Sequence, residues 1–383
     1  MTTADSRLPR LPALDGLRGI AVTWVIYHNA AILELPRNTH WTLQPAAWPL
    51  RLFDHFAQTG WAGVHLFFVL SGFLITRILL ASRESTVYFR AFFFRRVVRI
   101  FPLYYLALAA VLLLLPHTPS APRALLDTQQ HQLPLWVFLC NWFQPFGVAV
   151  FGLTHFWSLA VEEQFYAVWP LAVRYLRSAS LLWLAAVLCL AALGIRHLMV
   201  AHGVDREVTY QFTICRMDAL LAGAMVALAC HVPRTRERVA RARAWLLPLA
   251  LLIVIAGAIP TRGYELTLPA TQVVGYTTLG AGFALLIARL VVGGTPGPLR
   301  FLEWGWLRSL GKYSYAMYVI HYPLDRYLFH PMLQREYGGV PPPGVEALYG
   351  TGLLVLSYCL GYLSYVLIER RFLRLGHSST ATT

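Results

Sequence analysis

Apolar stretches of about 20 residues, the length of helix that spans the ~30 Å hydrocarbon core of a bilayer, recur from one end of this 383-residue chain to the other. Only 13% of the residues are charged, whereas soluble proteins carry roughly a quarter. The sequence therefore predicts an all-α, polytopic protein embedded in a lipid bilayer.

The net charge of +14 is concentrated in short arginine-rich loops between the apolar stretches. This is the positive-inside pattern that orients membrane helices, and it argues against nucleic-acid binding. The five cysteines are scattered without a CxxC pair, so they indicate small buried side chains rather than disulfides or metal ligands. Since no two histidines have HxxH or HxxxH spacing, we expect no metal site.

Apolar stretches begin near residues 13, 60, 99, 133, 154, 179, 210, 245, 271, 310 and 346. If all of them crossed the membrane, the strongly basic loop 234–243 would face outside, against the positive-inside rule. The weakest candidate is 133–150, which is interrupted by Asn141, Gln144 and Pro145. We therefore predict ten transmembrane helices with both termini cytoplasmic, and a re-entrant or interfacial segment at 133–150.

Two adjacent glutamates, Glu162 and Glu163, lie within an apolar, aromatic stretch at 154–170. A charged side chain at the bilayer centre costs about 3 kcal/mol on insertion scales, so such residues usually face the interior of a helix bundle and mark a function. We therefore expect these carboxylates to belong to the site of an enzyme or a transporter.

The first apolar stretch carries Arg18 near its predicted cytoplasmic end and His28 ten residues later, which is about 15 Å deeper. An imidazole there can take and give a proton near neutral pH, whereas a histidine bonded to a core carbonyl would be structural. Ten residues offset Arg18 and His28 by about 80° around a regular helix. Either the helix contains a local bulge, or the two residues do not act as one unit.

Three arginines, Arg95, Arg96 and Arg99, lie where the stretch near residue 99 enters the membrane. Arg96 and Arg99 share one helix face at i and i+3, and the planar guanidinium group suits phosphate. Phosphate binding and simple anchoring of the topology are both compatible with this pattern.

Other polar residues also occur within apolar stretches. Ser71 and Gly72 are small residues that allow close helix packing, and we prefer that role for Ser71 to a nucleophilic one because no base lies beside it in sequence. Arg216 and Asp218 share one apolar run, and His321 is a second intramembrane histidine.

Six motifs in fixed order resemble the acyltransferase-3 family of integral membrane acyltransferases. They are LDGLR with a following histidine (14–18 and His28), LFFVLSGFLIT (66–76), RxxRIxPxY (96–104), WSLxVEEQFY (157–166), RxDxLxxG (216–223) and GKxSYxxYxxH (311–321). The resemblance covers residues 11–372, and we expect residues 1–383 to form a single membrane acyltransferase domain. It departs from the family at His65, where relatives often have Asp.

The resemblance implies a ten-helix bundle that moves an acyl group, usually acetyl from acetyl-CoA, onto a hydroxyl, with no permanently bound cofactor. It implies a multi-pass protein of a bacterial inner or plasma membrane. Motif matching implies that His28 and Arg18 are the central catalytic pair, and that arginines bind the CoA phosphates from the cytoplasmic side: Arg95, Arg96 and Arg99. Glu162, Glu163 and His321 would complete the site.

Two mechanisms remain open. A hydroxyl must lose a proton as it attacks a thioester carbonyl, and His28 oriented by Glu162 is the first choice of base, with Glu163 second. Arg18, a tyrosine or backbone groups could stabilise the oxyanion. Alternatively, His28 itself is acylated and passes the group to the acceptor.

The acceptor also remains open. Family acceptors include surface polysaccharide, lipopolysaccharide, Nod-factor sugars and macrolides. We favour a carbohydrate or glycolipid hydroxyl over a macrolide or another small molecule because that use is commoner in the family. A proton-coupled transporter or flippase, in which embedded Glu and His residues relay protons, is the alternative of another class.

Overall fold

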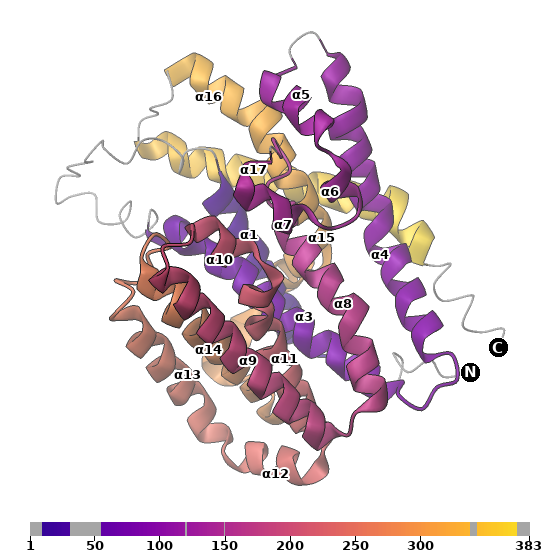
Figure 1. Ribbon diagram of the computed structural model, residues 1–383, viewed down its shortest axis with the longest axis vertical. Helices are drawn as coiled ribbons and strands as arrows, with labels where there is room; N and C mark the ends of the chain where they lie inside the picture. The colour runs from indigo at the N-terminus through magenta and orange to yellow at the C-terminus, as the bar shows by residue number, and fades with distance from the viewer. Residues whose placement is uncertain (1–9, 31–54, 119–120, 149, 338–342, 374–383) are drawn as a thin grey trace.

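The computed structural model describes residues 10–30, 55–118, 121–148, 150–337 and 343–373. Within these ranges the regular structure is entirely helical and contains no strand, so the all-α prediction is confirmed for this part of the chain. Figure 1 shows a bundle of long helices, with several short helices gathered at one end and α12 at the other.

Ten of the described helices have 16 or more residues. They are α1 (Pro12–Asn29), α3 (Ala62–Ala81), α4 (Tyr88–Ala109), α8 (Phe156–Tyr175), α9 (Ser178–Ala201), α11 (Thr213–His231), α13 (Arg243–Ala258), α14 (Tyr276–Gly293), α15 (Gly305–Leu324) and α17 (Pro343–Ser364).

Shorter helices connect or extend the long ones. The α-helical ones are α5 (Arg123–Gln130), α6 (Leu133–Trp136), α7 (Cys140–Phe143), α10 (Arg206–Gln211), α12 (Pro233–Arg241) and α16 (His330–Tyr337). The 3₁₀ turns are η4 (Thr59–Trp61), η6 (Leu115–His117), η7 (Gln144–Phe146) and η9 (Gly297–Glu303). The π-helical turns are η5 (Ala110–Leu114), η8 (Thr271–Gly275), η10 (Asp325–Phe329) and η11 (Tyr365–Glu369).

Six helical stretches in the described residues are long and apolar enough to cross a membrane: His55–Ala81, Tyr88–His117, Ser178–Ala201, Arg206–His231, Thr271–Gly293 and Ala347–Leu373. A seventh is added if α12 and α13, which meet at a bend of 74°, form one broken span. Helices α1, α8 and α15 are not among them, because polar residues interrupt their apolar runs. The count of ten spans and the cytoplasmic termini stay predictions, and residues 1–9 and 31–54, which separate or precede the first described helices, lie outside the described residues.

Segment 133–150 does not form one long helix. It contains α6, α7 and η7, which are three short turns joined by irregular backbone. The buried Asn141 amide donates to Gln211 O at 3.2 Å and to Thr213 Oγ1 at 3.0 Å. Protein groups therefore accept the hydrogen bonds of the Asn141 side chain, as a polar group at membrane depth requires.

Glycines bring the central helices into close contact. A Cβ atom at Gly311 of α15 would lie 1.8 Å from the Asp15 carbonyl oxygen of α1, and one at Gly72 of α3 would lie 1.8 Å from the Leu220 carbonyl oxygen of α11. Only glycine permits backbones to approach this closely. The packing role predicted for Gly72 is thus confirmed: α1 packs closely against α15, and α3 packs closely against α11.

Candidate active site

Glu162 lies on α8 at the centre of a buried polar group that also involves α1, α3 and α4. The Tyr166 hydroxyl, one turn further along α8, donates to Glu162 Oε2 at 3.0 Å and is itself hydrogen-bonded to Ser71 Oγ. The Arg96 guanidinium carbon lies 5.4 Å from the centroid of the Tyr166 ring. Ser71 therefore also has a hydrogen-bonding role that packing alone did not predict.

Five predicted residues interact electrostatically in this region. Arg18 interacts with Glu162 and Arg99, and Arg96 interacts with Arg99 and both glutamates. We call this group the carboxylate cluster, which consists of Arg18, Arg96, Arg99, Glu162, Glu163 and Tyr166. It combines two carboxylates with three guanidinium groups, so each of the half-buried glutamates has cations nearby, as charged groups in a bilayer require.

Arg95 directly precedes Arg96 on α4. It is half-buried on α4, and its position next to Arg96 turns it about 100° away around the helix. The face that meets Glu162 therefore comprises Arg96 and Arg99, as the i, i+3 spacing predicts.

His28 lies at the other end of α1, where its Nδ1 is 3.1 Å from Ala57 O. Because a carbonyl oxygen only accepts, this contact places the proton on Nδ1. The α1 helix is regular from Pro12 to Asn29, so no bulge brings His28 toward Arg18, and ten residues separate the two by about 15 Å along the axis. Arg18 and His28 therefore lie far apart along α1, and the catalytic roles predicted for these two residues and for Glu162 stay predictions.

His321 is joined to α1 through Asn29 rather than through His28. Its Nδ1 is 2.7 Å from Tyr318 O, and its Nε2 is 3.2 Å from the Asn29 side-chain nitrogen. The carbonyl fixes the proton on Nδ1, so Nε2 accepts from the Asn29 amide. Both ring nitrogens of His321 therefore have protein partners.

His155, at the beginning of α8, completes this second group. Its ring centroid lies 5.1 Å from that of His321, and its backbone carbonyl accepts the Tyr318 hydroxyl at 3.1 Å. Ser158 Oγ lies 2.5 Å from the same tyrosine oxygen. We call this group the histidine cluster, which consists of Asn29, His155, Ser158, Tyr318 and His321.

One helix links the two groups. His155 and Glu162 are seven residues apart on α8, which corresponds to about 10 Å along its axis. The sequence analysis missed Asn29, His155, Ser158 and Tyr318 as site residues. A signal was nevertheless present, because Asn29 follows His28 directly and His155 precedes the WSL of the fourth motif.

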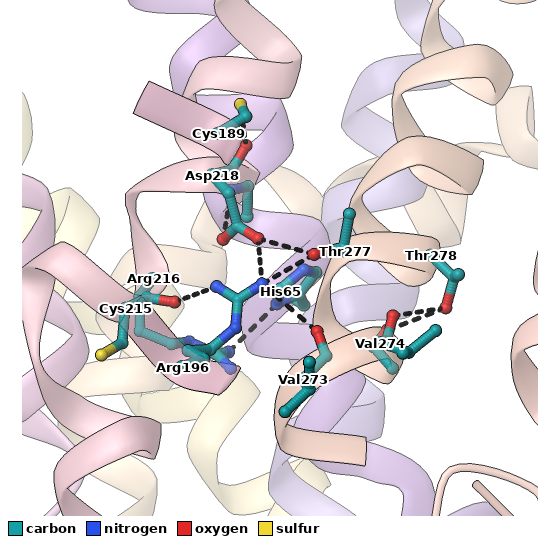
Figure 2. A network of polar contacts seen from close by, with 12 residues as sticks. His65, Cys189, Arg196, Cys215, Arg216, Asp218, Val273, Val274, Thr277 and Thr278 are labelled. Carbon is teal, nitrogen blue, oxygen red and sulfur yellow. Dashed lines mark hydrogen bonds and ion pairs between the residues drawn. The ribbon is translucent and has the colours of Figure 1, made fainter. Parts of the chain in front are cut away.

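A third polar network joins α3, α9, α11 and α14, as Figure 2 shows. Arg196 Nη2 forms a buried ion pair with Asp218 Oδ2 at 2.8 Å, and it also donates to Thr277 Oγ1 at 2.6 Å. Asp218 Oδ1 accepts the Ala219 amide at 3.0 Å. Asp218 is therefore paired with Arg196 of α9, and not with Arg216, which shares its apolar run.

Arg216 instead meets His65, the position where this sequence departs from its family. Arg216 Nη2 lies 3.1 Å from His65 Nδ1, and the guanidinium carbon lies 4.2 Å from the centroid of the Tyr276 ring. A neutral imidazole thus accepts from Arg216, and nearby aromatic rings offset part of the cost of burying the cation. This network stabilises the helix packing beside the candidate site.

Among the described residues, no three His, Cys, Asp or Glu side chains are arranged to hold a metal ion. The two clusters supply acid–base and hydrogen-bonding groups.

Comparison with known proteins places these features in context. A family model described as an acyltransferase domain, of the acyltransferase-3 type, matches residues 11–366. YrhL of Bacillus subtilis, named as a candidate peptidoglycan O-acetyltransferase, is 31% identical over 339 residues, which are 82% of this chain and 48% of YrhL. The peptidoglycan O-acetyltransferase OatA of Listeria monocytogenes is 28% identical over 344 residues, which are 84% of this chain and 50% of OatA.

The O-acetyltransferase OatA of Staphylococcus aureus is 25% identical over 340 residues, which are 82% of this chain and 50% of that protein. The chain thus spans about half the length of the curated relatives it matches. No solved structure matches it at a significant level.

Proposed function

Because the chain belongs to the acyltransferase-3 family, we propose that it is a multi-pass membrane O-acyltransferase that transfers an acyl group, in the first instance acetyl, from acyl-CoA to a carbohydrate or glycolipid hydroxyl. The names of the relatives support acetyl as the group and a glycan as the acceptor. We place it in a bacterial inner or plasma membrane.

The observation that carries this proposal is that α8 contributes residues to both clusters and so joins them. Arg96 lies beside Glu162 and Tyr166 in the carboxylate cluster, and the histidine cluster lies further along the same helix. A phosphate group is recognised best by guanidinium forks. Arg96 and Arg99 are therefore the residues that would hold the CoA phosphates, with the thioester directed toward the histidines.

The transfer needs a base at the acceptor hydroxyl. As the hydroxyl oxygen bonds to the acyl carbon, the carbon–sulfur bond breaks and the proton ends on the CoA thiol. A histidine side chain near the site can carry that proton. The family resemblance implies that this histidine is His28. Direct transfer and transfer through acyl-His28 share these atoms and differ only in whether the imidazole forms a bond to the acyl carbon.

The proposal is tested with the purified protein in nanodiscs and radiolabelled acetyl-CoA. Binding and turnover are measured for the wild type and for Arg96→Ala and His28→Ala. Arg90→Ala is the matched control, because Arg90 is an exposed arginine on the same helix.

We expect Arg96→Ala to lose binding, His28→Ala to lose turnover, and Arg90→Ala to retain both. A wild-type protein that engages no acyl-CoA would contradict the proposal, and a response to a proton gradient would then favour a carrier.

A further inference from the structure

His155 is a buried imidazole whose nitrogens the fold leaves unused. The residue is 4% exposed, and neither Nδ1 nor Nε2 has a hydrogen-bond partner within 3.5 Å among the described residues, although backbone groups of Tyr318 and Val319 lie near the ring. Buried polar atoms in proteins are nearly always paired, so an unpaired one calls for a functional or structural reason. The ring is surrounded by side chains of α15: Tyr318, His321 and Tyr322.

The backbone around His155 is firmly held. Gly152, with a φ of 73°, forms the turn before α8, and the Phe151 amide donates to Thr128 Oγ1 at 2.8 Å. The His155 carbonyl accepts from Ser158 Oγ and from the Tyr318 hydroxyl, each at 3.1 Å. The imidazole is thus positioned by its backbone and by aromatic packing, without a hydrogen bond to the ring itself. A ring fixed in this way is pre-organised for a ligand.

The neighbouring histidines differ from His155 in this respect. Both nitrogens of His321 are bonded to protein groups, and Nδ1 of His28 is bonded to Ala57 O. Within the histidine cluster, His155 is therefore the imidazole that retains both a donor and an acceptor nitrogen for a substrate.

We propose that His155 is a catalytic residue that contacts the attacking hydroxyl of the acceptor and takes its proton. This inference rests on the proposed function, and it places at His155 the proton transfer that the family resemblance assigns to His28. The hydroxyl oxygen forms a bond to the acyl carbon of the thioester, the electron pair of the breaking carbon–sulfur bond goes to sulfur, and the proton passes from the hydroxyl to His155 and then to the thiolate. The N–H of the same ring can donate to a second oxygen, which suits the adjacent hydroxyls of a sugar.

A catalytic role and a purely structural role of His155 predict different results for one substitution, because neither ring nitrogen has a hydrogen-bond partner within 3.5 Å. His155→Phe preserves a planar ring of similar size and removes no bonded atom. If His155 only packs against α15, this variant folds and stays active. If His155 takes the proton, the variant folds and binds acetyl-CoA but loses turnover.

The experiment measures acetyl-CoA binding, the unfolding temperature and acetyl transfer to solubilised peptidoglycan fragments in nanodiscs. We compare the wild type, His155→Phe, His155→Gln and the control His197→Phe, since His197 is exposed on α9. His155→Gln covers the case in which Phe does not fit, because glutamine is smaller and polar but cannot take a proton.

We expect turnover to fall at least 100-fold in both His155 variants, the lower bound for loss of a general base, with acetyl-CoA binding unchanged. Turnover within a few-fold of wild type in either folded variant overturns the assignment. A wild-type protein that binds no acetyl-CoA instead refutes the proposed function, and the assignment with it. Loss of acetyl-CoA binding in both His155 variants, with His197→Phe unaffected, also overturns it, because His155 would then serve the donor.

Discussion

The buried ion pair between Arg196 and Asp218 gives a quantitative test of the structure. The two side chains are 0% and 4% exposed, and the carboxylate also accepts hydrogen bonds from Thr277 and the Ala219 amide. Arg216 is the second buried arginine of this network, and its own polar partner is the neutral His65. Asp218→Ala therefore leaves two buried guanidinium groups with no carboxylate of the network to balance them.

Removing one partner of a buried pair costs about 3–5 kcal/mol, because the remaining charge stays desolvated. We expect Asp218→Ala to lower the free energy of unfolding by that amount. Asp218→Asn keeps the shape and one acceptor but loses the charge, so its expected cost is about 1.5–3 kcal/mol, typical of a hydrogen bond to a charged group.

The assay is equilibrium unfolding in mixed micelles with an increasing fraction of denaturing detergent, followed by the helical circular dichroism signal. Glu207→Ala is the matched control, because its pair with Arg206 has a similar length of 2.9 Å but is 38% and 41% exposed. Exposed pairs contribute about 0–1 kcal/mol. The reasoning fails if Asp218→Ala is no more destabilising than Glu207→Ala.

Three further predictions concern packing, the carboxylate cluster and topology. Gly311→Ala should cost about 1–3 kcal/mol in the same unfolding assay because its Cβ would meet the Asp15 carbonyl, while Gly297→Ala, with open space around it, should be neutral. Tyr166→Phe should reduce acetyl-CoA turnover about 10- to 100-fold with folding intact, since Glu162 loses its hydroxyl donor and a hydrogen bond to a charged group is worth about 1.5–3 kcal/mol. An unchanged rate would contradict that role. A reporter fused after Arg243 should read cytoplasmic, and a periplasmic signal would refute the ten-span topology.

The carboxylate cluster was predictable because its members are charged residues within apolar runs. Lipid excludes such residues, so Arg18, Arg96 and Glu162 had to face one another inside a bundle. The interruption of segment 133–150 was predictable for the same reason, since Asn141 needs protein partners at that depth. In both cases the cost of exposure to lipid acts on each residue regardless of the tertiary fold.

The histidine cluster and the Arg196–Asp218 pair could not be predicted in this way. Which end of α1 meets which end of α15 depends on helix packing, and the pairing of Asn29 with His321 across 292 positions follows from that packing alone. The position of Asp218 two residues after Arg216 gave no indication that its partner is Arg196 on α9. Partners on other helices become visible only with the tertiary fold.

Helix α8 presents one polar stripe, with His155, Ser158, Glu162 and Tyr166 at intervals of three and four residues. The stripe is bonded to α3 through Ser71 and to α15 through Tyr318. A shift of α8 by one residue would rotate it about 100° and turn the entire stripe away from these partners at once. Only one rotational setting of the helix therefore satisfies both contacts, and that setting fixes the positions of Glu162 and His155 relative to each other.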